Sequence, residues 1–240
     1  MNPQERGLNK AEHYLNQALV ITRKVTETAR KTSREAKELL STPTDIELTE
    51  ALTTEAGIRD VVLVPCSITD TVQDLLVRKA DRGELEYYQM VNEHSLGGVA
   101  AGIYLATGRQ VLIHMQNSGL TNAADGIISF ANVYKIPIPT VVTYRGNNLK
   151  DDSEPHQEIG KMTADLTRTV FKGRVHGDRL GRGILKAAER MFGDVKDGYP
   201  SVLRLAPQAF RKVHPIRLPE GEFDVRGYEE NYKRFIEVHG

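Results

Sequence analysis

Short apolar runs alternate with helix-like stretches between residues 45 and 207, and this alternation constrains the fold more than any other feature of the chain. The first run, Val61-Val62-Leu63-Val64, is apolar at every position, which is typical of a strand covered on both faces. Further strand-like runs are residues 87–91, 110–115, 140–143 and 201–205. Because strands that alternate with helices form βαβ units with right-handed crossovers, the pattern predicts an α/β fold, a parallel sheet with helices on both faces.

The stretches between these runs predict the helices. Thr44 or Asp45 is expected to cap the first helix, since both residue types are favoured at that position. The segment from Tyr144 to Gly160 is polar and is expected to be a loop. The predicted helices lie at residues 45–57, around 72–76, at 120–133 and at 178–192.

Glu93 lies where a predicted strand ends and a Gly/Ala-rich helix begins. That helix includes Gly97, Gly98 and Gly102, and each glycine costs a helix about 1 kcal/mol relative to alanine. Such a cluster indicates close approach of the backbone to a ligand or to a neighbouring element. Glu93 itself has two interpretations: a carboxylate favoured by the helix dipole, or a buried acid that hydrogen-bonds a cofactor.

Polar residues gather on four loops that each follow a predicted strand. Because the carboxyl ends of parallel strands share one edge of a sheet, and open α/β sheets bind ligands there, we expect these loops to form one site. The loops are Cys66-Ser67, Glu93-His94, Gln116 to Gly119, and Arg145 to Gly160.

Composition removes several classes of function. Lysine plus arginine and aspartate plus glutamate both number 32, so no net charge favours nucleic acid or an anionic membrane. Cys66 is the single cysteine, which excludes an internal disulfide and a multi-cysteine metal site. No apolar run approaches the roughly 20 residues of a membrane span, and the first residues have no apolar core of a secretory signal. We therefore expect a cytoplasmic protein.

Familiar nucleotide and hydrolase motifs are also missing from the sequence. No G-x-G-x-x-G follows the first strand, and no G-x-x-x-x-G-K-[ST] is present. Ser118 lies in Asn-Ser-Gly-Leu, which lacks the first glycine of a G-x-S-x-G nucleophile elbow.

The two ends of the chain differ from its middle. Residues 1–43 are expected to be a helical extension, because small and apolar residues recur over residues 9–40 with a 3.5-residue period. That helix either lies on another subunit or is solvated. Residues 44–207 form the predicted α/β domain, and 208–240 a tail with a possible docking helix. Tyr228, Tyr232 and Phe235 would share one face of it.

The order of the loop motifs resembles the pyrimidine-binding (PYR) domain of thiamine-diphosphate enzymes over roughly residues 45–207. Within these enzymes the chain is most similar to the sulfopyruvate and phosphonopyruvate decarboxylases, and to the separate alpha subunit of the former. The motifs that carry the resemblance are Val64-Pro65-Cys66-Ser67, Val91-Asn92-Glu93-His94, Gln116 to Asn122, Tyr144-Arg145-Gly146, and Glu154 to Gly160.

The resemblance implies roles for individual residues. Glu93 matches the acid that hydrogen-bonds the aminopyrimidine of the cofactor and so promotes loss of the proton from its reactive carbon. Gln116 and Asn117 would face the reacting carbon, although a turn that bonds its own backbone is the alternative. The remaining expected contacts are Ser67, Gly119 and Asn122 to the cofactor, and Arg145, His156, Gln157 and His94 to the substrate.

Three further assignments keep an alternative. Ser67 is equally well explained as a helix N-cap. Arg145 would fork onto a sulfonate or phosphonate, or form a surface ion pair. His94 would relay a proton, or be an ordinary surface histidine.

The resemblance also implies a partner. The diphosphate and Mg²⁺ are expected on a second, diphosphate-binding (beta) subunit, because the Gly-Asp-Gly motif with its asparagine pair is not found here. Gly193-Asp194-Val195 and Gly177-Asp178-Arg179 are incomplete versions, so no metal ligand is predicted in this chain. The expected protein is a carbon–carbon lyase active only with its partner, as an α₂β₂ or larger hetero-oligomer. A carboligase subunit and a non-catalytic scaffold or regulatory homologue are the alternatives.

Overall fold

The computed structural model describes residues 27, 31, 42–146, 153–177 and 183–214 of the chain. The chain divides into two units, Met1–Pro43 and Thr44–Gly240. In the first unit, Glu27 and Lys31 have helical backbone and exposed side chains, and the rest of the predicted helix over residues 9–40 lies outside the described residues. The predicted docking helix of the tail lies outside them too, so both predictions remain open.

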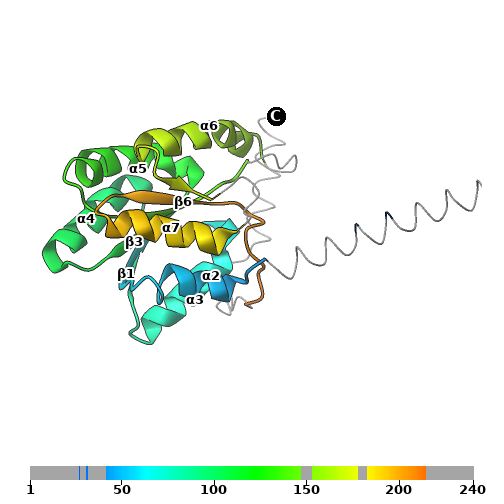
Figure 1. The fold of residues 1–240 in the computed structure, drawn as a ribbon, viewed down its shortest axis with the longest axis horizontal. Coiled ribbons are helices and arrows are strands. Elements are labelled where there is room, and N and C mark those ends of the chain that lie inside the picture. Colours follow the sequence, from blue (N-terminus) through cyan, green and yellow to red (C-terminus); the bar gives the residue numbers. More distant parts are fainter. Residues whose placement is uncertain (1–26, 28–30, 32–41, 147–152, 178–182, 215–240) are drawn as a thin grey trace, which may run out of the picture. The chain divides into compact units, whose positions relative to one another are not determined.

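The second unit is built on a parallel sheet (Figure 1), as the sequence predicted. Among the described residues the sheet has six strands in the order β2-β1-β3-β4-β6-β5. The short β5 was not predicted, because two residues carry no periodic pattern. The strands are β1 (Asp60–Leu63), β2 (Glu86–Gln89), β3 (Val111–Gln116), β4 (Pro139–Thr143), β5 (Val175–His176) and β6 (Ser201–Leu205).

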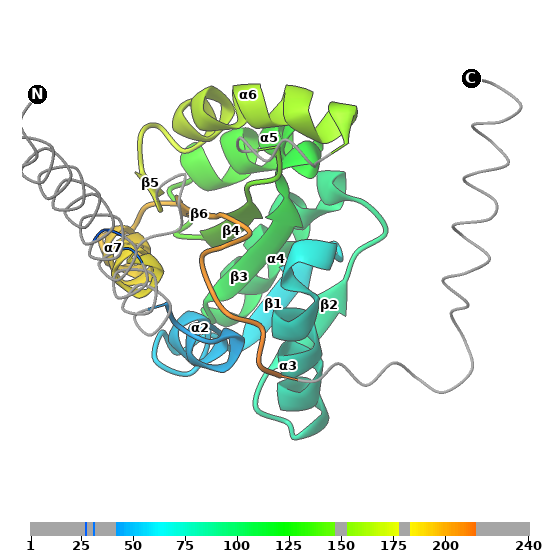
Figure 2. The ribbon, with the colours of Figure 1, turned by 90° about the vertical axis from the view of Figure 1, so that its right-hand side faces the viewer.

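Helices cover both faces of this sheet, which confirms the predicted fold class (Figure 2). Side chains alternate along β1 between two apolar cores, because successive residues of a strand point to opposite faces. Val61 and Leu63 pack with α2 (Asp45–Leu52), α3 (Asp70–Asp81) and α7 (Ile184–Lys196). Val62 packs on the other face, and this explains why the run was apolar throughout. The helices of that second face are α4 (Leu96–Thr107), α5 (Leu120–Gly126), the π-helical turn η4 (Ile127–Asn132) and α6 (Glu154–Val170).

One of the clustered glycines is explained by a neighbouring element. A Cβ atom on Gly97 would lie 2.7 Å from the carbonyl carbon of Gly126, so the backbones of α4 and α5 touch at this point. Gly98 and Gly102 face open space instead. Close approach to a neighbouring element, one of the two expected reasons for the cluster, therefore holds for Gly97 alone.

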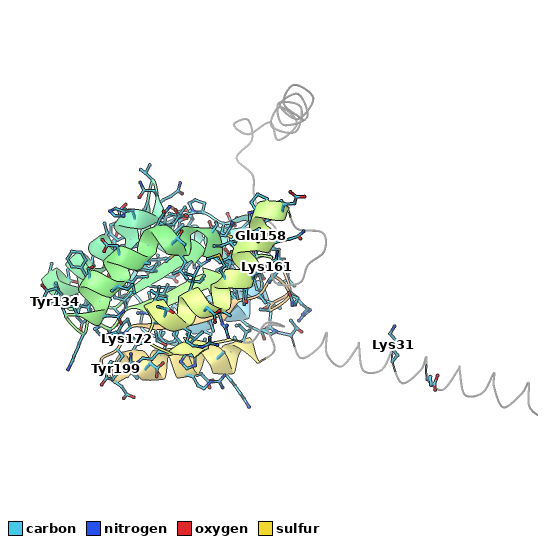
Figure 3. The ribbon with its side chains drawn as sticks, turned by 90° about the horizontal axis from the view of Figure 1, so that it is seen from above. Lys31, Tyr134, Glu158, Lys161, Lys172 and Tyr199 are labelled. Carbon is cyan, nitrogen blue, oxygen red and sulfur yellow. The ribbon has the colours of Figure 1, made fainter. Side chains whose placement is uncertain are left out.

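The loop predicted from Tyr144 to Gly160 was wrong over its second half. The structure starts α6 at Glu154, with Ser153 as N-cap residue and Pro155 in the first turn. Proline is favoured at the start of a helix, where its missing N–H is not needed, and it had been interpreted as a loop residue. The outer face of α6 carries an ion pair between Glu158 and Lys161 (Figure 3).

Other boundaries moved by smaller amounts. The first helix ends at Leu52 rather than near Gly57, and the α-helical part of residues 120–133 ends at Gly126, where η4 continues it. The described part of α7 begins at Ile184, while residues 178–182 lie outside the described range. No helix in the described part of the chain is both long enough and apolar enough to cross a bilayer.

Candidate active site

Four loops meet at the carboxyl edge of the sheet, because β1, β2, β3 and β4 are parallel and adjacent. Three of them begin with a single 3₁₀ turn. These turns are Ser67–Thr69 after β1, Glu93–Ser95 after β2 and Asn117–Gly119 after β3, and Arg145 and Gly146 follow β4.

The side chain of Glu93 lies directly over Gly119. A Cβ atom at position 119 would come within 2.3 Å of the Cγ, Cδ and Oε1 atoms of Glu93. Gly119 has an ordinary helical φ of −81°, so the close contact and not the backbone conformation requires a glycine. The Glu93 side chain is partly exposed, and no described residue hydrogen-bonds or ion-pairs with its carboxylate. The described residues therefore bury this acid only in part.

Asn117 fastens the β3 loop to two other elements. Its side chain is fully buried. Its Nδ2 donates to the carbonyl oxygen of Arg145 at 2.9 Å and to Oγ1 of Thr163 at 2.8 Å, and its Oδ1 accepts from the Arg145 N–H at 3.3 Å. The bonds cross between loops, unlike the local turn considered from sequence. The predicted catalytic role of Asn117 stays a prediction, and its observed role is to position Arg145.

Gln116 is half-buried beside Asn117, and its side chain makes fewer hydrogen bonds than that of Asn117. Its Nε2 donates to Ser118 Oγ at 2.8 Å, and its Oε1 lies 3.6 Å from the Sγ of Cys66. The residue therefore joins the β3 loop to the β1 loop at the site.

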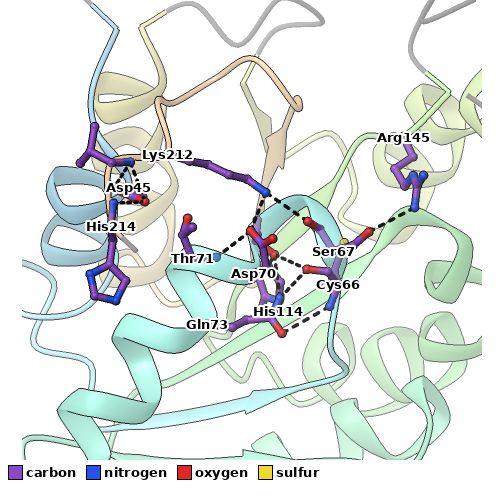
Figure 4. Close-up of polar contacts among 12 residues, drawn as sticks. Asp45, Cys66, Ser67, Asp70, Thr71, Gln73, His114, Arg145, Lys212 and His214 are labelled. Carbon is purple, nitrogen blue, oxygen red and sulfur yellow. Dashed lines mark hydrogen bonds and ion pairs between the residues drawn. The ribbon is translucent and has the colours of Figure 1, made fainter. Parts of the chain in front are cut away.

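A buried chain of hydrogen bonds supports the β1 loop from below (Figure 4). Cys66 Sγ lies 3.3 Å from Thr143 Oγ1, and the Cys66 carbonyl accepts from Gln73 Nε2 at 2.7 Å. Gln73 also donates to Thr69 Oγ1 at 2.9 Å, and Thr69 Oγ1 lies 2.9 Å from His114 Nε2. Burial lowers the pKa of His114 to about 4, so the ring is neutral at pH 7.

The sequence analysis missed Thr69, Gln73 and His114. The available signal was His114, a polar residue inside the otherwise apolar run of β3. A histidine in a strand covered on both faces must find a buried partner.

Ser67 lies between two basic side chains. Arg145 Nη1 lies 3.4 Å from Ser67 Oγ, and Lys212 Nζ donates to the Ser67 carbonyl at 3.2 Å. Lys212 also pairs with Asp70. Among the described contacts the Ser67 hydroxyl makes no capping bond, so the N-cap interpretation does not describe this serine. Lys212 was not predicted, because it lies in the segment assigned to the tail.

The other predicted residues lie around this group. His156 is half-buried in the first turn of α6, with Nδ1 at 2.7 Å from Ser153 Oγ, and Gln157 follows it. A Cβ atom on Gly146 would lie 1.8 Å from the His156 carbonyl oxygen, so the β4 loop rests on this turn. His94 and Asn122 are exposed, and no described contact joins them to the other predicted residues.

The described residues contain no group of three or more His, Cys, Asp or Glu side chains placed to hold a metal ion.

Comparison with known proteins gives relatives for about half of the chain. No family model matches. Over 116 residues, 48% of this chain, it is 35% identical to the sulfopyruvate decarboxylase alpha subunits of Methanococcus maripaludis and Methanothermobacter thermautotrophicus. The aligned segment spans 66% and 67% of those proteins, respectively. It is also 32% identical over 114 residues to the phosphonopyruvate decarboxylase of Streptomyces viridochromogenes, of which it spans 28%.

Solved structures support the fold. The benzoylformate decarboxylase of Polynucleobacter necessarius matches with a TM-score of 0.54 and 18% identity. The match covers 80% of this chain and 36% of that one. At this identity the match shows a shared fold and nothing about substrate.

Proposed function

The chain belongs to the family of the sulfopyruvate decarboxylase alpha subunits, and on this premise we propose that it is the pyrimidine-binding subunit of a two-chain, thiamine-diphosphate-dependent 2-oxo acid decarboxylase. The proposed substrate is sulfopyruvate or phosphonopyruvate, a three-carbon oxo acid with a second anionic group. The proposed reaction releases carbon dioxide and an aldehyde. The aligned segment reaches only about two thirds of the alpha subunits, so the activity is proposed for this chain and not transferred from them.

The arrangement of Glu93 over Gly119 carries this proposal. A carboxylate without a described partner, at the end of a parallel strand and above a position where even a Cβ would collide, fits an acid that awaits a ligand. Gly119, Ser67 and Asn122 are the further proposed contacts to the cofactor.

The residues of this chain would bind, orient and control protons. Thiamine diphosphate, when bound, supplies the electron sink for the electron pair of the carbon–carbon bond that breaks when carbon dioxide is released. Glu93 would hold a proton on its carboxyl group against the pyrimidine ring, which is general acid–base help. Gln116, which contacts Ser118 and Cys66, would present its amide to the substrate. Asn117 positions the backbone of Arg145, whose guanidinium would bind the anionic group.

A diphosphate-binding partner subunit is part of the proposal. The relatives are named as alpha subunits, and such a name implies a second kind of chain. We propose that this partner holds Mg²⁺ and, through it, the diphosphate, since Mg²⁺ needs carboxylate and amide oxygen ligands and the Gly-Asp-Gly motif that would supply them is not found in this sequence. An α₂β₂ or larger assembly in the cytoplasm is the corresponding expectation.

Reconstitution tests the proposal. Calorimetry on the purified chain with thiamine diphosphate and Mg²⁺ should show little binding and no decarboxylation. Addition of a partner chain with the Gly-Asp-Gly motif should restore both, with sulfopyruvate or phosphonopyruvate decarboxylated in preference to pyruvate. Micromolar binding and turnover by the chain alone would contradict the two-chain proposal, and a reconstituted complex that converts none of the three acids would contradict the activity.

A further inference from the structure

Two basic side chains approach Ser67 from opposite sides of the β1 loop (Figure 4). Arg145 follows β4 and reaches the hydroxyl oxygen of Ser67 at 3.4 Å. Lys212 follows β6 and donates to the carbonyl oxygen of the same residue at 3.2 Å. Lys212 is far from Ser67 in the sequence, yet it adds a second cation, beside Arg145, to the edge where the substrate is proposed to bind.

Lys212 is held there by an anchored segment, residues 211–214, which we name the strap. Asp45 is fully buried, and its carboxylate accepts the backbone N–H groups of Val213 and His214 at 3.1 Å each. On the other side of Lys212, the carbonyl of Arg211 accepts from the Asp45 N–H at 2.9 Å. Because bonds to the backbone flank Lys212 on both sides, the strap fixes where its side chain starts.

A second pair strengthens the strap. His214 Nε2 lies 2.5 Å from Asp74 Oδ2 on α3. Burial acts to raise the pKa of Asp74, but the hydrogen bonds with Arg78 and His214 outweigh it and lower that pKa. The strap therefore crosses from β6 to α3 and passes the β1 loop.

Lys212 and Ser67 keep hydrogen-bond donors that the described contacts do not use. An ammonium has three N–H donors, and among the described residues Lys212 bonds only to Asp70 and to the Ser67 carbonyl. The Ser67 hydroxyl accepts from Arg145, and its own O–H has no acceptor in the described part of the chain. The side chains of Lys212 and Asp70 are 42% and 38% exposed, so their ion pair is screened by water and is easily exchanged.

We propose that Lys212 is a specificity-determining residue, which with Arg145 and the Ser67 hydroxyl binds the sulfonate or phosphonate group of the substrate. Asp70 is the partner of Lys212 when no substrate is present. A sulfonate or phosphonate offers three acceptor oxygens, which suits donors that converge from two sides. This inference rests on the proposed function and adds a residue to it.

Kinetics of the reconstituted enzyme give the first test. Lys212→Met should lower the ratio of kcat/KM for sulfopyruvate to kcat/KM for pyruvate by about tenfold, since it removes one hydrogen bond to a charged group. Asp70→Asn should raise that ratio or leave it unchanged, because it frees the ammonium. Lys186→Met, which removes an exposed lysine of α7, is the matched control and should not alter the ratio.

The opposite results would overturn the inference. If Lys212 only pairs with Asp70, then Lys212→Met and Asp70→Asn should each change kcat/KM for sulfopyruvate and for pyruvate by the same factor, and both variants should do so in the same direction. A ratio for Lys212→Met equal to that of Lys186→Met would also exclude a role in specificity.

A binding measurement separates this inference from the proposed activity. The full chain alone is titrated with methylphosphonate, and the backbone amide resonances of Ser67 and Asp70 are followed by NMR. We expect saturable shifts that weaken about tenfold in Lys212→Met, and this result supports the anion site even if the complex decarboxylates nothing. No shift in the native chain, or equal shifts in the variant, would overturn the inference even if the enzyme is active.

Discussion

The β1–β3 side of the site and its β2 side are built in opposite ways. On the first, buried polar side chains such as Asn117 and Gln73 bond to the protein itself. On the second, Glu93 has no described partner, His94 is exposed and Val91 is 97% exposed. Burying an unpaired polar group costs free energy, so a folded chain satisfies the groups that serve only its structure. The difference indicates that the first side is a support and that the second side is completed by a group outside the described residues.

The largest expected effect comes from the unpartnered side. Glu93→Gln should lower kcat of the reconstituted enzyme by about 10²–10⁴-fold, because it removes a general acid–base group. Thermal unfolding should be unchanged, since glutamine keeps the shape of the side chain over Gly119 and no described hydrogen bond or ion pair is lost. Glu158→Gln on the outer face of α6 is the control and should keep full activity. Near-normal turnover of Glu93→Gln would show that this acid has no part in the mechanism, and the β2 side would then not differ in function from the β1–β3 side.

On the supporting side the expected effect is on stability. Asn117→Ala removes the acceptor of the Arg145 N–H and the amide that donates to Thr163 Oγ1, and should cost about 2–3 kcal/mol in the free energy of unfolding. Asn122→Ala removes the same amide from an exposed position of α5 and should cost less than about 0.5 kcal/mol. Urea titration of the two variants measures the difference. Equal costs would show that burial at Asn117 does not matter for stability.

Two glycines test the difference between a structural contact and a contact of the proposed catalytic acid. Gly97→Ala forces α4 away from the backbone of Gly126 and should cost about 1–3 kcal/mol of stability. Gly119→Ala collides only with the flexible side chain of Glu93, so it should cost less stability and should lower kcat by about 10²-fold through misplacement of the acid. Calorimetric unfolding and kcat of both variants check this. The reverse assignment of effects would show that Gly119 is a structural glycine.

The effect that is smallest near neutral pH concerns the buried network. Burial lowers the pKa of His114 from 6.5 to about 4, so the unfolded chain binds a proton at a higher pH than the folded chain does. Stability therefore rises with pH across this window: the stability is retained above pH 6.5 and is lost as the pH falls from 6.5 towards 4, by about 1.4 kcal/mol per pH unit. Urea unfolding of the native chain and of His114→Gln at several pH values isolates the contribution. Identical slopes would assign the acid sensitivity to other groups.

The local pattern of residues was enough to predict the parallel sheet and the loops that meet at its edge. Val61 to Val64 marked a strand buried on both faces, and Glu93 marked the boundary between β2 and the following helix. Both features depend on burial and on neighbours along the chain, and a sequence pattern reports these directly. The glycine cluster predicted a close contact, but only the structure showed that the backbone of Gly97 packs against that of Gly126.

What the tertiary structure alone decided are contacts between residues far apart in the sequence. Pro155 was interpreted as part of a loop, whereas α6 begins at Glu154 and packs its Gly160 against Gly146 of the β4 loop. Lys212 reaches Ser67 only because Asp45 anchors the strap, and the link between these positions leaves no periodic trace in the chain. Hydrogen bonds of this kind depend on where whole elements are placed, and residue-by-residue preferences do not contain that information. The sequence alone therefore determined the fold class and the site edge, and the tertiary structure decided which side chains support the site and which remain open to a ligand.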